Sequence, residues 1–206
     1  PLLLGRELWM ETRIALFQQS IDTRSSANHL REKQRRVRFG NNWVHHSVSE
    51  LYKDQISRFP LILTTDIPGP DALATLANGD VPKLRALNLH NGTVYTWNRP
   101  CYGISDTGFP HLRIENRYLP SGPTLSDEMA NFAFWVGLMK AMPEKYRQLP
   151  GQVNYCKLVD NFYRAARTGL DTVFEWFGSA IPAERLLLEE LLPLARTGLE
   201  RCGVNN

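Results

Sequence analysis

The feature that most constrains the fold of this chain is a run in which every second side chain is ionisable, His111-Leu-Arg-Ile-Glu-Asn-Arg117. In a β-strand, successive side chains point to opposite faces, so the run predicts a strand with His111, Arg113, Glu115 and Arg117 on one face. Four ionisable groups make a poor hydrophobic core, but they can bind phosphates, carboxylates or a divalent cation. We expect this face to line a cavity. The alternative is a solvent-facing strand with cross-strand ion pairs.

A second alternating segment, residues 87–99, comes shortly before this run. It predicts a strand that carries Trp97 and Arg99 on one face, and Gly92 in its middle indicates a bulge or a close approach to the backbone. A turn over residues 100–110 would join the two strands. We therefore expect a small antiparallel sheet.

Helical patterns precede and follow this predicted sheet. Residues 6–21 have apolar side chains at helical spacing, and Ser47 with Glu50 has the form of a capping box for a helix that ends before Pro60. Residues 64–80 predict a loop. Beyond residue 123 we expect three helices: a buried one over 127–142, one whose apolar stripe runs from 158 to 177, and one that starts at Pro182, with Pro193 kinking or dividing it.

These elements predict an α+β fold in which a small antiparallel sheet packs against a mainly helical C-terminal half. We expect one domain over residues 1–206, with a helical and loop part (1–82), a β part (83–122) and a helical part (123–206). The chain begins with Pro1 and stops directly after a helical pattern. We expect it to be an incomplete portion of a longer protein.

Composition excludes several classes of protein. No apolar run reaches the length of about 18 residues that a membrane helix needs. Three cysteines, odd in number and far apart, predict reduced thiols in a cytoplasmic protein and no disulfide framework. The basic run over 24–38 has Phe39 as its one neighbouring aromatic residue and the net charge is only +3, so we expect a solvated loop or a lid over an anionic ligand. A nucleic-acid surface is the less favoured alternative for this run. No phosphate-binding GxxxxGK[ST] or GxGxxG motif is present.

The segment Arg113-Ile-Glu-Asn-Arg117, followed by Pro120 and an apolar helical stretch, resembles a pattern of glutamine-synthetase-like carboxylate–amine ligases. The resemblance is closer to the type 2 glutamate–cysteine ligase family. Members of that family have stretches similar to Asn91-Gly-Thr-Val-Tyr-Thr-Trp-Asn-Arg-Pro100, to His111-Leu-Arg-Ile-Glu-Asn-Arg117 and to Pro120-Ser-Gly-Pro-Thr124. Residues 8–14 and 189–195 are also similar to the family.

This resemblance implies an ATP-dependent ligase in which the sheet forms part of a glutamine-synthetase-like active-site funnel. Glu115 would bind a catalytic Mg²⁺ or Mn²⁺, and Arg117 and Arg99 would be the catalytic arginines. The implied reaction phosphorylates the γ-carboxylate of glutamate with ATP, and an amine, by family default that of cysteine, then attacks the acyl phosphate. Metal and arginines would stabilise charge on the transferred phosphoryl group.

Further substrate-binding candidates are Arg13, Arg113, His111 and Trp97, which could stack on adenine. Arg24 is another family-like position. Arg13 and Arg24 are otherwise ordinary surface charges, and Trp97 is otherwise a core residue.

Members of the family begin with a glutamate-rich strand that is not found in this chain. We therefore expect a middle-to-C-terminal portion that binds metal-nucleotide weakly and has little or no ligase activity alone. Its partner would be the missing N-terminal part of the same enzyme or a second copy of the chain. The alternative from another class is a non-catalytic binding or assembly module that retains a ligase-like shell.

Overall fold

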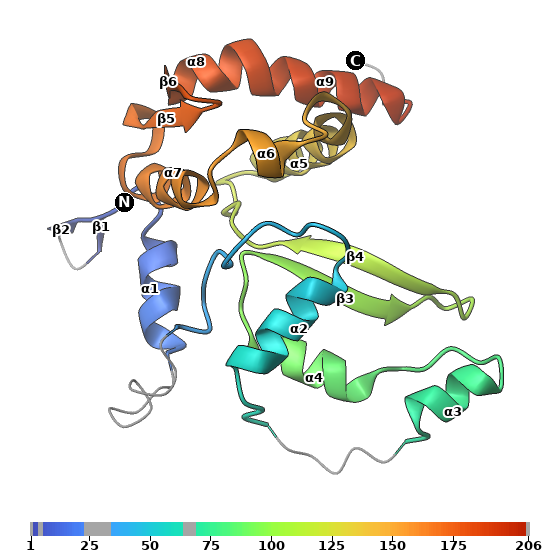
Figure 1. The fold of residues 1–206 in the computed structure, drawn as a ribbon. Coiled ribbons are helices and arrows are strands. Elements are labelled where there is room, and N and C mark those ends of the chain that lie inside the picture. The colour runs from blue at the N-terminus through green and yellow to red at the C-terminus, as the bar shows by residue number, and fades with distance from the viewer. Residues whose placement is uncertain (1, 4–5, 23–33, 64–68, 205–206) are drawn as a thin grey trace. The chain divides into compact units, whose positions relative to one another are not determined.

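The computed structural model describes the chain except residues 1, 4–5, 23–33, 64–68 and 205–206, and its fold is α+β, as predicted (Figure 1). The chain divides into two units. The first unit comprises Pro1–Ile14 with Leu119–Asn206, and the second unit comprises Ala15–Tyr118. Helix α1 (Thr12–Ser20) begins in the first unit and ends in the second. Strands in the described residues form three two-stranded antiparallel sheets.

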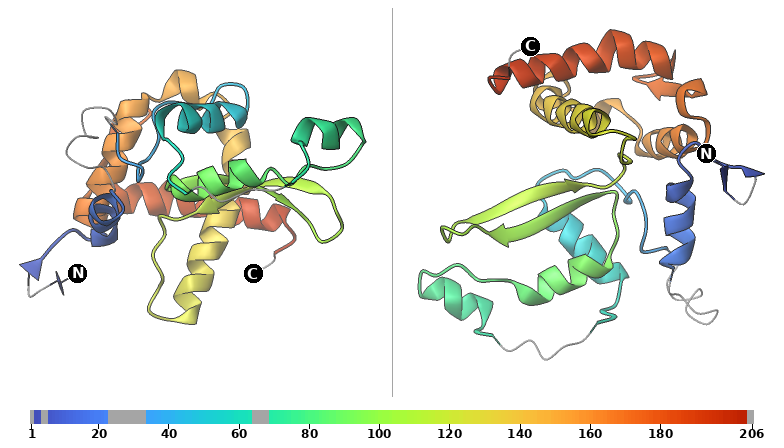
Figure 2. Two further views of the ribbon diagram at one scale, coloured as in Figure 1. Left: turned by 90° about the horizontal axis from the view of Figure 1, so that it is seen from below. Right: turned by 180° about the vertical axis from the view of Figure 1, so that it is seen from behind.

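The second unit is built on an antiparallel ribbon of β3 (Asn98–Ile104) and β4 (Pro110–Asn116). The ribbon confirms the strand predicted from the alternating run. A parallel bridge between Arg38 and Thr96 adds backbone pairing at its inner end. The outer end projects beyond α2 (Ser49–Arg58) and α4 (Arg85–Thr93), so the turn at its tip stands clear of both helices (Figure 1 and Figure 2).

The strand predicted over residues 87–99 is wrong in its first half, because α4 occupies Arg85–Thr93. His90, Asn91 and Val94 are buried and Leu87 is half-buried, which is the i, i+3, i+4, i+7 spacing of one helix face. The two-residue spacing of Leu87 and Leu89 concealed this helical period. The bulge predicted at Gly92 is also absent, since Gly92 lies in the helix with open space around it.

Helix α2 ends just before Phe59 and Pro60, as predicted. Glu50 accepts hydrogen bonds from three backbone amides that precede the helix, those of His45, His46 and Ser47. The Ser47 hydroxyl instead bonds the Ser49 hydroxyl, so only the glutamate half of the predicted capping box is formed. Part of the loop predicted over 64–80 is a short helix, α3 (Ala72–Ala77), which Asp71 caps. The core of this unit contains Val37, Phe59, Val94, Trp97 and Cys101.

In the first unit the long helix α5 (Leu125–Lys145) packs against α9 (Leu192–Arg201). Thr124 and Asp127 form a capping box at the start of α5. Gly137 and Ala141 are the buried residues of α5, whereas Met129 and Phe132 keep 57% and 62% of their surface exposed. The prediction that this helix is buried on all sides is therefore wrong for the described structure.

The last helix starts directly after Pro182, as predicted, and runs through α8 (Ala183–Leu186), a π-helical turn η3 (Leu187–Leu191) and α9. Proline lacks an amide hydrogen, and its ring clashes with the carbonyl four residues earlier. The wider π turn directly before Pro193 accommodates that ring, so α8, η3 and α9 follow one another without a break.

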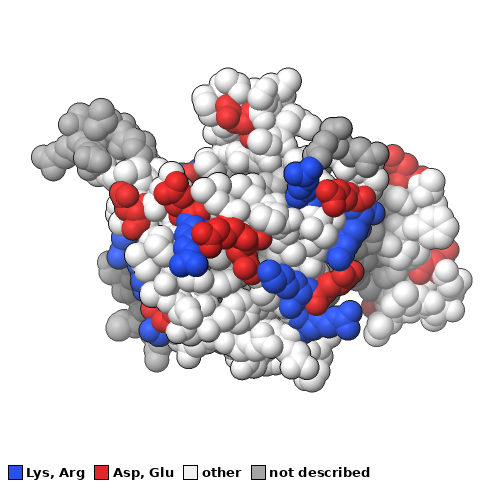
Figure 3. Space-filling view, turned by 90° about the horizontal axis from the view of Figure 1, so that it is seen from above, with Lys and Arg blue, Asp and Glu red and all other residues white. Residues whose placement is uncertain are grey.

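Basic and acidic side chains are interspersed on the face of the molecule that Figure 3 shows. Two ion pairs, Arg185–Glu189 and Arg196–Glu200, lie along the last helix.

The helical stripe predicted over residues 158–177 stops early, because α7 (Tyr155–Thr168) ends at Gly169, whose φ is +56°. A 3₁₀ turn, η2 (Gly169–Asp171), follows, and then a hairpin of β5 (Val173–Trp176) and β6 (Ser179–Pro182). The buried amide of Asn161 attaches this hairpin to α7. It donates to the Glu175 carbonyl at 2.8 Å and accepts from the Glu175 amide at 3.0 Å.

The remaining elements of the first unit are short: β1 (Leu2–Leu3), β2 (Arg6–Glu7) and α6 (Leu149–Gln152). The Glu11 amide donates to the carbonyl of Ala166 near the end of α7, so the N-terminal segment belongs to this unit. None of the helices in the described residues is long and apolar enough to cross a membrane.

The α5–α9 contact predicts which glycines cannot be replaced. A β-carbon at Gly137 would clash with the Ala195 carbonyl, and one at Gly198 would clash with the Gly137 carbonyl. Gly137→Ala or Gly198→Ala should therefore lower the free energy of unfolding by about 1–3 kcal/mol or more. The measurement is urea unfolding followed by circular dichroism. The control is Gly151→Ala, where the β-carbon meets nothing within 4 Å. Equal stability of all three variants would contradict this packing.

Candidate functional site

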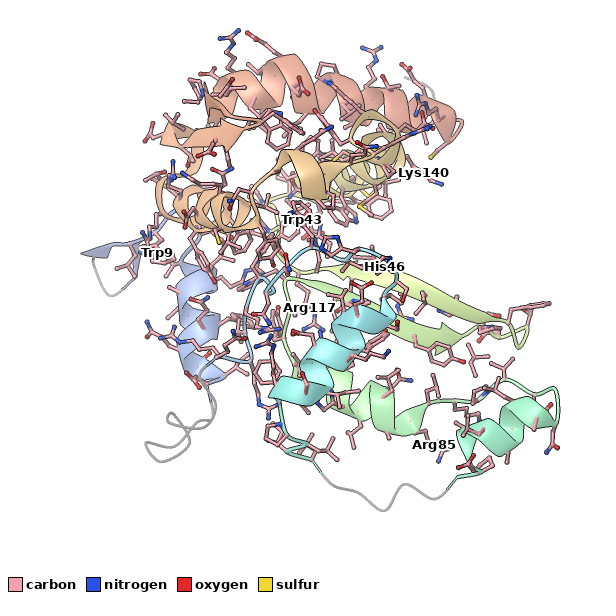
Figure 4. All side chains as sticks on the ribbon, viewed as in Figure 1. Trp9, Trp43, His46, Arg85, Arg117 and Lys140 are labelled. Atoms are coloured by element: carbon pink, nitrogen blue, oxygen red, sulfur yellow. The ribbon has the colours of Figure 1, made fainter. Side chains whose placement is uncertain are left out.

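The β3–β4 ribbon carries the predicted ionisable face, and the pairing of the two strands determines which residues of β3 share it. Arg99 pairs with Glu115, Cys101 with Arg113, and Gly103 with His111. Residues paired across an antiparallel ribbon lie on the same face, so β3 adds Arg99 and Cys101 to the face that β4 carries. Arg117 follows directly after β4, at the inner end of the ribbon (Figure 4).

Glu115 is the centre of this face and binds two arginines through one oxygen. Its Oε2 accepts hydrogen bonds from Arg99 Nε at 2.9 Å and Nη2 at 2.6 Å, and from Arg117 Nη2 at 3.0 Å. The thiol of Cys101 lies 3.6 Å from the same oxygen. The Glu115 side chain remains 40% exposed. Oε1 has no hydrogen bond to any residue that the structure describes.

The two guanidinium groups change the ionisation of Glu115. Partial burial is the largest single influence and acts to raise the pKa of this carboxyl, but the hydrogen bonds and positive charges of Arg117 and Arg99 together outweigh it. The pKa of Glu115 therefore lies below its ordinary value of 4.5, and the carboxylate is ionised at neutral pH.

Arg117 is held in place by three different contacts. Its backbone amide donates to the Trp97 carbonyl at 2.9 Å, and its guanidinium carbon lies 4.3 Å from the centre of the Tyr95 ring. The Tyr95 ring in turn lies 5.3 Å from that of Phe17 in α1. Of the Arg117 side-chain nitrogens, only Nη2 is hydrogen-bonded within the described part of the chain. Nε and Nη1 have no hydrogen bond to a described residue, and the side chain is 17% exposed.

His111 and Arg113 extend the face toward the exposed tip of the ribbon. Arg113 Nη1 lies 3.3 Å from His111 Nε2. Both side chains cross the space above Gly103, where a β-carbon would lie 2.8 Å from His111 Nε2 and 3.0 Å from Arg113 Nη1. Gly103 is thus the residue that lets them lie against β3. Three arginines stand on this face against one carboxylate, so it is electropositive.

The other predicted site residues are not part of this cluster. Trp97 is fully buried in the core of the second unit, with its ring 5.4 Å from that of Tyr95. Arg13 belongs to the first unit, where its Nε lies 3.4 Å from Glu11 Oε1. Arg24 lies outside the described residues, as do Arg31 and Lys33 of the basic run. Within that run Arg36 and Arg38 are buried, and Arg36 Nη2 donates to the Pro60 carbonyl at 2.7 Å.

The described residues do not by themselves fit a divalent cation. Mg²⁺ and Mn²⁺ prefer several oxygen ligands, and Glu115 offers one unengaged carboxylate oxygen. No group of three or more His, Cys, Asp or Glu side chains that could hold a metal ion occurs in the part of the chain that the structure describes. We therefore derive no chemical step through a metal at this position.

Two residues that support the cluster were missed from the sequence. Asn91 donates through Nδ2 to the Pro100 carbonyl at 2.8 Å, and its own carbonyl accepts from Arg99 Nη1 at 3.4 Å. Tyr95 supplies the aromatic face beneath Arg117. A helical interpretation of residues 85–93 would have turned Asn91 toward β3. No sequence pattern indicates that Tyr95 and Arg117 meet.

Comparisons with protein-family models, with curated proteins and with solved structures found no match to this chain.

The pairing of Glu115 with two arginines predicts that the free energy of unfolding depends on pH. A carboxyl whose pKa is lowered in the folded state stabilises the fold above its unfolded pKa, and this contribution is lost as the pH falls. Glu115→Gln should lower the free energy of unfolding at pH 7 by roughly 0.5–1 kcal/mol, a small value because the carboxylate is 40% exposed. The difference between wild type and variant should begin to shrink near pH 4.5, the ordinary pKa of the carboxyl, and should vanish only below the lower pKa of the folded state. Urea unfolding of both proteins at pH 7, 5 and 3.5 measures the difference in their free energies of unfolding. A difference that does not change with pH would contradict the pairing of Glu115 with the arginines.

Proposed function

We propose that this chain provides the phosphate- and carboxylate-binding part of an ATP-dependent carboxylate–amine ligase similar to glutamate–cysteine ligase. The observation that carries the proposal is the arrangement around Glu115. One carboxylate holds two arginines, and one of them, Arg117, has two side-chain nitrogens without a hydrogen bond to a described residue. The class of reaction is inferred from the resemblance of residues 111–117 to the ligase family.

The electrostatics of the ribbon support binding of a highly charged substrate. Arginine forms forked hydrogen bonds to phosphate and carboxylate, and its planar group is already oriented here by Glu115 and Tyr95. Because Arg117 is held before any ligand arrives, little side-chain entropy is lost when an anion binds. Arg113 provides a further positive charge on the same face.

The proposed reaction has two steps. The γ-carboxylate of glutamate attacks the γ-phosphorus of ATP, which forms an acyl phosphate and releases ADP. An amine, proposed to be that of cysteine, then attacks the acyl carbon, and inorganic phosphate leaves as the amide forms. In this scheme Arg117 and Arg99 bind and stabilise the charge of the transferring phosphoryl group. Glu115 positions both arginines. Mg²⁺ or Mn²⁺ would neutralise the nucleotide phosphates once further oxygen ligands are supplied.

The second candidate function is a non-catalytic assembly module, and α5 favours it. Leu125, Met129 and Phe132 follow one another at spacings of four and three residues, so they lie on one face of the helix. All three are more than half exposed. Contiguous apolar side chains on a surface are typical of protein interaction sites.

Substitution in the arginine cluster tests the ligase proposal. In a longer natural protein that supplies the remaining metal ligands, we expect glutamate-dependent release of ADP from ATP with Mg²⁺ or Mn²⁺ present, and γ-glutamyl amide product by mass spectrometry. The chain of 206 residues alone should show little or none of this activity. Arg117→Lys should lower this rate by about 10- to 100-fold, because an ammonium group cannot reproduce the forked contact. Glu115→Gln should lower it similarly. Lys53→Ala, on the exposed side of α2, is the control and should leave the rate unchanged.

The assay is made on the chain of 206 residues and on any longer natural protein that contains it. Circular dichroism establishes that each variant is folded. A rate that Arg117→Lys and Glu115→Gln do not change would remove the cluster from the reaction. If neither protein consumes ATP, while Phe132→Ser abolishes association with another chain, the assembly function replaces the ligase.

A further inference from the structure

The outer edge of strand β4 has no partner strand among the described residues of the second unit. Within those residues, β3 is the one strand that pairs with β4. The residues from Pro110 to Ile114 are exposed, and Leu112 and Ile114 keep 56% and 52% of their surface exposed. A two-stranded ribbon is only marginally stable in water, and an open edge is a template on which another strand can pair.

The hydrogen bonds at the two ends of the ribbon show which backbone groups point to this edge. At the tip the Ser105 amide donates to the Phe109 carbonyl at 2.9 Å, and at the inner end the Arg117 amide donates to the Trp97 carbonyl at 2.9 Å. Hydrogen-bonded pairs alternate with non-hydrogen-bonded pairs along an antiparallel ladder. The odd-numbered residues of β4 therefore bond β3, and the even-numbered residues from Leu112 to Asn116 turn their amides and carbonyls outward. None of these outward groups is hydrogen-bonded to the backbone of a described residue.

The two faces of β4 have different chemistry along this edge. Leu112 and Ile114 lie on one face, and Arg113 and Glu115 lie on the face of the arginine cluster. Arg113 Nη1 contacts His111 Nε2 and no carboxylate of a described residue, and Glu115 Oε1 has no hydrogen bond to a described residue. A strand that pairs here therefore has to match apolar side chains on one face, and a cation and a carboxylate oxygen on the other.

The β4 strand itself matches this edge. Two copies can pair antiparallel about a twofold axis at Ile114, so that the outward amides and carbonyls of both strands bond each other. Ile114 then faces its own copy, Arg113 faces Glu115 on both sides of the axis, and Leu112 faces Asn116. An axis at Arg113 would set two arginines opposite each other, and an axis at Glu115 would set two carboxylates opposite each other. Charge therefore selects the register centred on Ile114.

We propose that two copies of this chain associate through β4 and form a four-stranded antiparallel sheet centred on Ile114. The guanidinium of Arg113 from the second copy binds Oε1 of Glu115, so each copy completes the charged face of the other. The Ile114 side chains of both copies pack together on the opposite face. His111 falls opposite Arg117, whose guanidinium is held by Glu115 of its own copy. This inference does not depend on the proposed ligase reaction.

Sedimentation equilibrium of the full chain tests the proposal. We expect a dimer with a Kd on the order of 10⁻⁵ M, because the contact between two edge strands is small. Arg113→Glu should weaken this dimer about tenfold or more, because the new carboxylate meets Glu115 of the other copy. Lys53→Glu, on the exposed side of α2, changes the net charge by the same amount and should dimerise like wild type. Circular dichroism establishes that both variants are folded.

Disulfide cross-linking tests the register separately, in a chain whose exposed Cys156 and Cys202 are replaced by serine. Facing residues of a hydrogen-bonded pair have their Cα atoms about 5.5 Å apart, a separation that a disulfide spans. Ile114→Cys should therefore form a covalent dimer on oxidation, seen on a non-reducing gel. Leu112→Cys should stay monomeric on that gel, because Leu112 faces Asn116 and lies far from its own copy.

Three results would overturn the proposal. The first is a chain that stays monomeric at about 200 μM, well above the expected Kd. The second is cross-linking of Leu112→Cys as fast as that of Ile114→Cys, because the register would then be different. The third is a dimer that Phe132→Ser dissociates and Arg113→Glu leaves unchanged, because the contact would then lie on α5.

Discussion

Two positively charged guanidinium groups meet at one carboxylate oxygen in the second unit, and the rest of the candidate site depends on this contact. Arg99 and Arg117 would repel each other at this separation without Glu115 between them. The carboxylate therefore sets the direction of both side chains. The backbone bond from Arg117 to Trp97 and the aromatic ring of Tyr95 limit the remaining freedom of Arg117. An anion that binds here meets a group that is already oriented.

The β3–β4 ribbon carries an excess of positive charge. Three arginines exceed one carboxylate on its face, so the face favours phosphate and carboxylate groups. The carboxylates of the neighbouring helix α2 differ from Glu115 in their partners. Asp54 accepts from the Arg38 and Arg58 side chains, and Glu50 accepts from backbone amides that precede the helix.

Alternation predicted the β4 part of the candidate site, and the strand register added the β3 part. A strand over residues 111–117 requires its ionisable side chains to share one face, and the register of β3 against β4 places Arg99 opposite Glu115. Alternation misled over residues 87–93, because Leu87 and Leu89 are two residues apart by chance within a helical pattern. The same local ambiguity concealed the β5–β6 hairpin, where the positive φ values of Phe177 and Gly178 build the turn. The contact between Tyr95 and Arg117 had no sequence pattern at all, since it joins residues that are distant in the chain.

The sequence by itself determined the α+β class, the charged strand, the end of α2 before Pro60 and the start of the last helix after Pro182. Each of these follows from side-chain periodicity or from the restricted backbone of proline, which act over a few residues. Only the tertiary structure decided that both arginines bind one oxygen of Glu115, that Trp97 is buried and that Tyr95 lies beneath Arg117. These are contacts between segments distant in the chain, and no local preference specifies which distant partner a side chain will meet.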